Sequence, residues 1–255
     1  MCKAETVLGH LQNRSIFMKK VIGIVPKGKL WKMEESNFSD LYEVGNNYCK
    51  RVQEAGAIPV AVTPVDGWLS EEAFALYDGY VVQGGSTFYP YHYQIIHDAV
   101  ENGKRYLGIC LGEQLIQSYF TMRKAVEEQG YEGSLIEAIL SFRKAQGSKY
   151  STLEKVAGHR AELVARGSED EAKHDVYVVP GTILHRLVGR ENVRAASYHD
   201  LHVPADRTIL TVNAWSAKGD HVVEGVELAP NILGVQFHPE VDDLLPEAFR
   251  FLTEE

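Results

Sequence analysis

Short apolar runs alternate with amphipathic stretches through the first half of the chain, and this alternation constrains the fold more than any other feature. The runs cover residues 21–25, 58–62, 80–82 and 105–109. Each has the length of a strand, and its largely apolar character is typical of strands that are covered on both faces. The alternation predicts an α/β fold of three layers, in which helices cover both faces of a mostly parallel central sheet.

Helical spacing fills the stretches between these runs. A helix is predicted over residues 41–54, where one face would carry Leu41, Val44, Tyr48 and Val52. Another is predicted over 111–120. The segment 121–170 is rich in Lys, Arg, Glu and Gln and holds several glycines. We expect an irregular or helical surface insertion there.

The second half of the chain is predicted to be richer in β structure. Its apolar runs cover residues 176–179, 193–196, 208–213, 222–228 and 232–237. We expect an additional small β segment there, followed by a closing helix over 244–252. Residues 1–17 are mixed polar and precede the first predicted strand. They are therefore expected to be an N-terminal extension outside the core, with a single α/β domain over residues 18–255.

Charge and cysteine content narrow the class of protein. The formal net charge is −9, and an acidic surface repels phosphate backbones, so a general nucleic-acid partner is disfavoured. The three cysteines, Cys2, Cys49 and Cys110, show no metal-ligand spacing and no disulfide framework. We therefore expect a reducing, cytoplasmic location. No apolar run approaches the roughly 20 residues that cross a bilayer, so no membrane association is expected.

Cys110 is the candidate nucleophile. It stands between a predicted strand and a predicted helix, in the run Gly108-Ile109-Cys110-Leu111-Gly112. A sharp strand-to-helix turn of this kind presents its central side chain, and the nearby glycines avoid collisions. The N-terminus of the following helix would favour thiolate over thiol. The alternative is a buried cysteine that serves only in packing.

A second candidate group ends the last apolar run, in Gln236-Phe237-His238-Pro239-Glu240. Pro239 cannot donate to a strand ladder, so the strand should stop close to it. His238 and Glu240 would then lie at the same edge of the sheet as Cys110. A histidine can take a proton from a thiol and return it to a leaving amine, and a carboxylate can orient that histidine. For either residue alone, a solvated surface position would be the favoured interpretation.

Gly84 and Gly85 follow another predicted strand, at the same edge. Paired glycines let the backbone approach a reacting carbonyl closely. Their N–H groups, with the amide of Leu111, are candidates for an oxyanion hole. An ordinary Gly-Gly turn is the alternative.

Together these motifs resemble those of class I glutamine amidotransferase domains. Within that superfamily the chain is most similar to the γ-glutamyl-γ-aminobutyrate hydrolase branch (peptidase family C26). The resemblance covers residues 19–253, weakly over 121–170, and implies a flavodoxin-like fold. It also implies a Cys110-His238-Glu240 triad that cleaves a γ-glutamyl amide through a thioester, with Gln114 contacting the substrate.

Less specific sequence matches also connect the chain to this branch. Pro90 and Tyr93 match its substrate-binding residues, although Thr87 stands where an acidic residue is expected. Ser197, Tyr198 and His199 resemble a serine-histidine loop of the branch that binds substrate. Glu224 fits a family carboxylate, and the segment 121–127 departs from the usual glycine-rich stretch. The histidines without an apparent ligand partner in the sequence are expected to be surface or packing residues, namely His97, His159, His174 and His185.

Three functions remain open at this stage. The first is a stand-alone hydrolase of small-molecule γ-glutamyl amides. The second is a glutaminase subunit that supplies ammonia to a separate synthase, and the third is a degenerate amidase that only binds a metabolite or partner. No metal or organic cofactor is implied, because the thiol carries the covalent chemistry. A homodimer is the default for such an enzyme.

Overall fold

The computed structural model describes residues 19–31, 39–146, 153–160, 173–241 and 245–254. These residues build a nine-stranded sheet in the order β4-β1-β5-β6-β13-β12-β11-β8-β9. In that order the strands are β4 (Ile58–Ala61), β1 (Val21–Val25), β5 (Gly79–Val82), β6 (Arg105–Ile109), β13 (Ile232–Val235), β12 (Val223–Leu228), β11 (Thr211–Ser216), β8 (Lys173–Val178) and β9 (Asn192–Ala196).

The strand pairing of the sheet changes from parallel to antiparallel at β13. From β4 to β13 every neighbouring pair is parallel, and from β13 to β9 every pair is antiparallel. The predicted α/β fold with a parallel central sheet is confirmed. The β segment expected in the second half continues this same sheet, because β13 pairs with β6 on one side and with β12 on the other.

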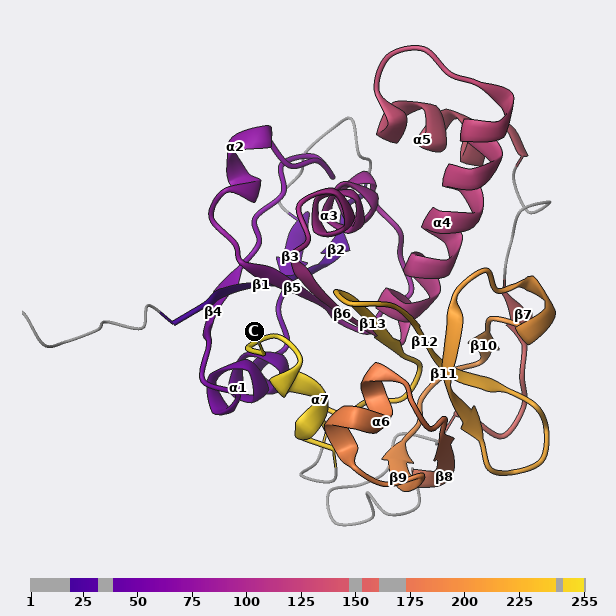
Figure 1. Cartoon of the computed structure of the whole chain (residues 1–255). Coiled ribbons are helices and arrows are strands. Elements are labelled where there is room, and N and C mark those ends of the chain that lie inside the picture. Colours follow the sequence, from indigo (N-terminus) through magenta and orange to yellow (C-terminus); the bar gives the residue numbers. More distant parts are fainter. Residues whose placement is uncertain (1–18, 32–38, 147–152, 161–172, 242–244, 255) are drawn as a thin grey trace, which may run out of the picture.

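Helices cover both faces of the sheet, as Figure 1 shows. One apolar layer is closed by α1 (Asn46–Glu54), α6 (Ile183–Val188) and α7 (Glu247–Arg250). The opposite layer is closed by α3 (Pro90–Glu101), α4 (Leu111–Gln129) and α5 (Leu135–Gln146). Side chains of β1 alternate between the layers: Ile22 and Ile24 belong to the first and Val25 to the second. A short helix, α2 (Glu71–Phe74), precedes β5.

The helix predicted over residues 41–54 starts later than expected. Its first residues form β3 (Leu41–Glu43), which pairs antiparallel with β2 (Lys27–Lys29), and α1 begins only at Asn46. Gly45 has an extended backbone, and its amide donates to the Gln83 side chain. Ladder bonds and this amide contact therefore outweigh the helical spacing of the first residues.

The structure also bears on the predicted insertion, the predicted closing helix and the expected N-terminal extension. The part of the expected insertion up to Gln146 is mostly helical, since α4 runs on to Gln129 and α5 follows, whereas its other described part, residues 153–160, contains a short strand. A small sheet pairs β7 (Glu154–Lys155) with β10 (Leu201–His202), and a 3₁₀ turn follows at η4 (Ala205–Arg207). The closing helix is confined to α7. The expected extension at 1–17 lies outside the described residues. Among the described helices, none combines the length and apolarity needed to span a bilayer.

Candidate active site

Cys110 occupies a strained turn between β6 and α4. Its φ of 53° and ψ of −101° lie in a region that side-chain-bearing residues rarely adopt. The turn is tight: a Cβ on Gly108 would lie 2.6 Å from backbone atoms of Gly112. A Cβ on Gly112 would lie 2.6 Å from the carbonyl oxygen of Val82. Glycine is therefore required on both sides of the thiol, as the elbow motif predicts.

The thiol lies in a pocket of about 890 Å³. The Cys110 side chain is largely covered, and its Sγ is 4.0 Å from the carbonyl oxygen of Tyr198. The pocket brings together several of the residues singled out from the sequence: Gly84, Gly85, Cys110, Leu111, Gln114, Tyr198, His199 and His238. A volume of this size suits a small organic substrate.

His238 and Glu240 lie just beyond β13, beside the Cys110 turn. The imidazole Nδ1 of His238 is 2.7 Å from Glu240 Oε1, and the backbone N–H of His238 donates to the carbonyl of Ala196. A Cβ on Gly84 would lie 2.7 Å from His238 Cε1 and 3.3 Å from Cys110 Cβ. Both side chains therefore flank Gly84, and the structure brings the three predicted triad residues together.

Electrostatics favour a charged imidazole at this position. Burial disfavours the imidazolium form of His238, but the neighbouring Glu240 carboxylate and the Cys110 side chain more than offset that cost. As a result, the pKa of His238 lies well above its ordinary value. The pKa of Glu240 is lowered, because contacts with His238 and Tyr48 outweigh the effect of its burial. An imidazolium held between a carboxylate and a thiol is suited to donate a proton to a leaving amine.

Tyr48 is a component of the site that sequence reasoning missed. Its hydroxyl accepts a hydrogen bond of 3.1 Å from the Gly84 amide and lies against the Glu240 carboxylate. The sequence placed Tyr48 on the apolar face of a helix, and tyrosines in that setting are usually packing residues. The polar role arises only because α1 lies beside the ends of β5 and β13.

The structure reduces the number of backbone amides that could form the predicted oxyanion hole. The Gly84 amide already donates to Tyr48. The amides of Gly85 and Leu111 have no acceptor among the described residues, and both residues line the pocket. Two of the three predicted donors therefore remain available to a substrate oxygen.

The residues predicted to bind substrate fall into two groups. Gln114, Tyr198 and His199 line the pocket, and the Gln114 side-chain amide donates to Leu201 and Gln236. Pro90, Tyr93 and Ser197 are buried behind its wall rather than exposed in it: Pro90 opens α3 and Ser197 donates to the carbonyl of His159.

Arg143 joins the pocket wall from the expected insertion. Its guanidinium donates to the hydroxyls of Tyr93 and Ser118 at 3.0 and 3.1 Å, and lies 4.4 Å from the centre of the Phe88 ring. Tyr93 itself does not line the pocket, but it contacts Arg143, which does. No local motif marks Arg143, because its position depends on how α5 packs against α3 and α4.

Two histidines depart from the sequence-based expectation. His159 and His174 are buried together with His199 around Glu224, and their ring nitrogens face its carboxylate. Both histidines are therefore buried rather than on the surface, and each has a carboxylate neighbour that the sequence did not indicate. The partners come from separate segments of the chain, so spacing in the sequence could not indicate them.

Comparisons with known proteins agree with this geometry. A family model described as glutamine amidotransferase class-I matches residues 38–244. The glutaminase domain of CTPS from Trypanosoma brucei, with bound acivicin, is similar at a TM-score of 0.63 and 17% identity, covering 92% of this chain and 93% of that chain. A protein described as a GMP synthase subunit, from Thermoplasma acidophilum, is similar at a TM-score of 0.54 and 18% identity, covering 92% of each chain. At this level of identity, the likeness to the two structures shows the fold alone.

Proposed function

The chain belongs to the class I glutamine amidotransferase family, and on that premise we propose that it is a thiol hydrolase of γ-glutamyl amide bonds. The observation that carries the proposal is that Cys110 and His238 line one pocket, with Glu240 in contact with His238, although Cys110 lies far from the other two in the chain. The class I family is consistent with hydrolysis of a glutamine amide. The triad and the choice of substrate are the proposal.

The proposed reaction has two halves. The Cys110 thiolate attacks the γ-carbonyl carbon and forms a C–S bond, and the amides of Gly85 and Leu111 bind the oxyanion. The His238 imidazolium gives its proton to the amine nitrogen as the C–N bond breaks, leaving a γ-glutamyl thioester. Neutral His238 then takes a proton from water, the resulting hydroxide attacks the thioester, and glutamate leaves as the C–S bond breaks. Glu240 holds the imidazole throughout.

The pocket favours a substrate with a bulkier leaving group than ammonia. Its volume of about 890 Å³ extends from Cys110 to Met122 and Arg143. That space is greater than a glutamine side chain needs and suits a γ-glutamyl amine. Such a stand-alone hydrolase corresponds to the γ-glutamyl-γ-aminobutyrate hydrolase branch that the chain resembles.

A second candidate is a glutaminase subunit that supplies ammonia to a synthase. The similarity to a CTPS glutaminase domain and to a GMP synthase subunit favours this alternative. The same triad would serve both roles, so substrate preference decides between them. A stand-alone hydrolase should release glutamate faster from γ-glutamyl amines than from glutamine. A synthase subunit should prefer glutamine and co-purify with a larger partner.

The test is a glutamate-release screen over γ-glutamyl amines and glutamine, with Cys110→Ala as control. We expect at least one γ-glutamyl amide to be cleaved, and the variant to lose about 10³-fold or more of the activity. Folded protein that releases no glutamate from any of these amides would reject the proposal.

Covalent labelling separates an active thiol from a degenerate site. Acivicin, the molecule bound in the Trypanosoma brucei domain, should add to Cys110 and raise the mass of the protein by one adduct. Cys110→Ala should stay unlabelled. Folded wild-type protein that resists labelling would favour a role in binding alone.

A further inference from the structure

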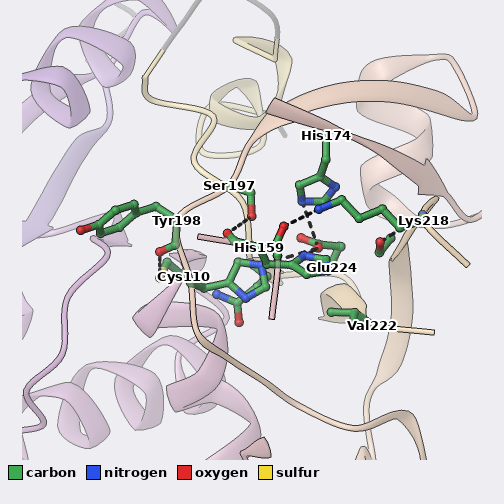
Figure 2. Close-up of polar contacts among 12 residues, drawn as sticks. Cys110, His159, His174, Ser197, Tyr198, Lys218, Val222 and Glu224 are labelled. Atoms are coloured by element: carbon green, nitrogen blue, oxygen red, sulfur yellow. Dashed lines mark hydrogen bonds and ion pairs between the residues drawn. The ribbon is translucent and has the colours of Figure 1, made fainter. Parts of the chain in front are cut away.

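Outside the proposed triad, three histidines and one glutamate converge at a buried point. His159 follows β7, His174 lies on β8, His199 lies between β9 and β10, and Glu224 lies on β12. Each of the four is at least nine-tenths buried. Figure 2 shows the imidazole of His174 and the ring of His159 directed towards the Glu224 carboxylate. One ligand atom from each of the four residues lies within 4.8 Å of every other.

The spacing of these atoms fits the coordination of a small cation. Glu224 Oε1 is 2.9 Å from His159 Nδ1, 3.2 Å from His174 Nε2 and 3.6 Å from His199 Nε2. Ligands held about 2.0–2.1 Å from a tetrahedral Zn²⁺ lie roughly 3.3 Å apart. The three distances bracket this value. Separations within the group reach at most 4.8 Å, so the more distant ligand atoms would move closer together on binding.

These inward atoms lack other partners. The three facing nitrogens and both Glu224 oxygens are buried, and among the described residues none of them has a partner in hydrogen-bonding geometry. Buried polar groups without partners are costly and rare in folded proteins. Five such atoms around one point therefore indicate a place suited to a positive centre.

The outward nitrogens of the three histidines are anchored as they are in metal sites. His159 Nε2 is 2.8 Å from Asp220 Oδ2, His174 Nδ1 is 3.1 Å from the Asp175 carbonyl oxygen, and His199 Nδ1 is 3.0 Å from the Leu201 carbonyl oxygen. A carbonyl oxygen can only accept, so the outer nitrogens of His174 and His199 carry protons. In the neutral ring, the inner nitrogen then presents its lone pair to the centre. Metal-binding histidines are oriented by contacts of this kind.

The charges around this point can also accommodate a divalent ion. A divalent ion with neutral rings and ionised Glu224 leaves +1, and Asp220 beside His159 balances that charge.

We propose that His159, His174, His199 and Glu224 form a binding site for a divalent first-row transition metal ion, with Zn²⁺ as the best-fitting ion. Imidazole nitrogens suit this class of metal, and four protein ligands make a closed site that serves structure. The site is distinct from the proposed triad, and metal binding requires no hydrolase activity.

The metal would stabilise one wall of the pocket. His199 N–H and Ser197 Oγ both donate to the carbonyl oxygen of His159, at 3.1 and 2.6 Å. Tyr198 lies between those two donors, and its carbonyl oxygen is the group 4.0 Å from Cys110 Sγ. Figure 2 shows this succession from the thiol to the histidine cluster. A metal that fixes His159 and His199 therefore fixes the backbone beside the thiol.

The test begins with the purified, folded chain and the metal alone. After dialysis against a chelator, we expect Zn²⁺ to bind at about one equivalent and to raise the thermal midpoint by about 5 °C or more at saturation. Co²⁺ should bind the same site and give the visible absorption of a tetrahedral complex. No stoichiometric binding of Zn²⁺ or Co²⁺ to folded protein would overturn the proposal and leave a hydrogen-bonded cluster.

Variants locate the bound ion. Glu224→Gln preserves shape and should reduce bound metal at least tenfold, and His174→Ala tests a second ligand if Glu224→Gln fails to fold. His185→Ala, in a histidine on α6 outside the cluster, should keep one equivalent. Cys110→Ser should also keep one equivalent, and loss of the metal in that variant would place the ion on the thiol and reject the site.

Discussion

Glu113 is a carboxyl group buried without a partner on the first turn of α4. Neither of its oxygens has a hydrogen-bond partner among the described residues. Burial, with a smaller contribution from Glu224, raises its pKa from 4.5 to about 8. The folded chain therefore keeps a proton on Glu113 that the unfolded chain has lost. Folding stability must fall as pH rises across that window, because the folded state binds more protons there.

Glu113→Gln removes this pH dependence while preserving the shape of the side chain. From pH 5 to pH 8 the wild type should lose stability relative to the variant, by about 3.5 kcal/mol. Chemical unfolding at the two pH values measures the difference. Glu137→Gln, at an exposed position on α5, should leave the pH dependence of wild type unchanged. Equal pH dependence in wild type and Glu113→Gln would show that Glu113 is ionised in the fold.

Glu240 sets the charge state of His238 in the proposed mechanism. The raised pKa of His238 keeps its imidazolium form as pH rises, and that form is lost above the raised pKa. Glu240→Gln removes the carboxylate, so the pKa of His238 should fall and the basic limb of kcat/KM should move to lower pH. Activity at the optimum should drop about 10²–10⁴-fold. A basic limb that stays in place would argue that another group controls it.

Tyr48 is expected to act as a positioning residue. Tyr48→Phe removes a hydroxyl that accepts from Gly84 and lies against Glu240. We expect kcat to fall about tenfold with little change in KM, since one hydrogen bond next to a charged group is lost. Tyr77→Phe is the matched control, because the Tyr77 hydroxyl makes only a 3.4 Å contact with the carbonyl oxygen of Ala61, on the edge strand β4. A rise in KM alone would instead indicate a role in binding.

At the scale of elements, the packing of α4 against β5 controls the elbow. Gly112→Ala would push a Cβ against the backbone of Val82, which cannot move without shifting the strand. We expect a loss of about 3 kcal/mol or more in the free energy of unfolding. Gly130 ends the same helix at a φ of 76° with open space around it, so Gly130→Ala should cost only about 1 kcal/mol. Similar losses in both variants would contradict the steric argument.

The helix α5 contributes Arg143 to the pocket, where a guanidinium is suited to a substrate carboxylate. Arg143→Gln should raise KM for the preferred γ-glutamyl substrate about 10–100-fold, with a smaller effect on kcat. Lys144→Gln changes the charge equally at the next, exposed position and should leave KM unchanged. Steady-state kinetics on both variants make the comparison. An unchanged KM in Arg143→Gln would assign Arg143 to packing.

For the molecule as a whole, the sequence could predict the features that depend on residues close together in the chain. The parallel strands and the Cys110 turn follow from short apolar runs and closely spaced glycines, so they could be read directly. The β2–β3 pairing could not, because residues 41–43 share the spacing of the helix that follows them. Tyr48, Arg143 and the His159–His174 pairing depend on contacts between distant segments, which no single stretch of sequence encodes.

The position of β13 has a consequence for how the protein is made. This strand lies between β6 and β12, yet it leaves the ribosome long after β6 does. A nascent chain that has already exposed Cys110 still lacks the neighbouring strand, and pairing across so long a separation is slow. The proposed acid–base group, His238, and its partner Glu240 are added only near the end of translation. Incomplete chains would therefore carry the Cys110 thiol without the groups that are proposed to make it reactive.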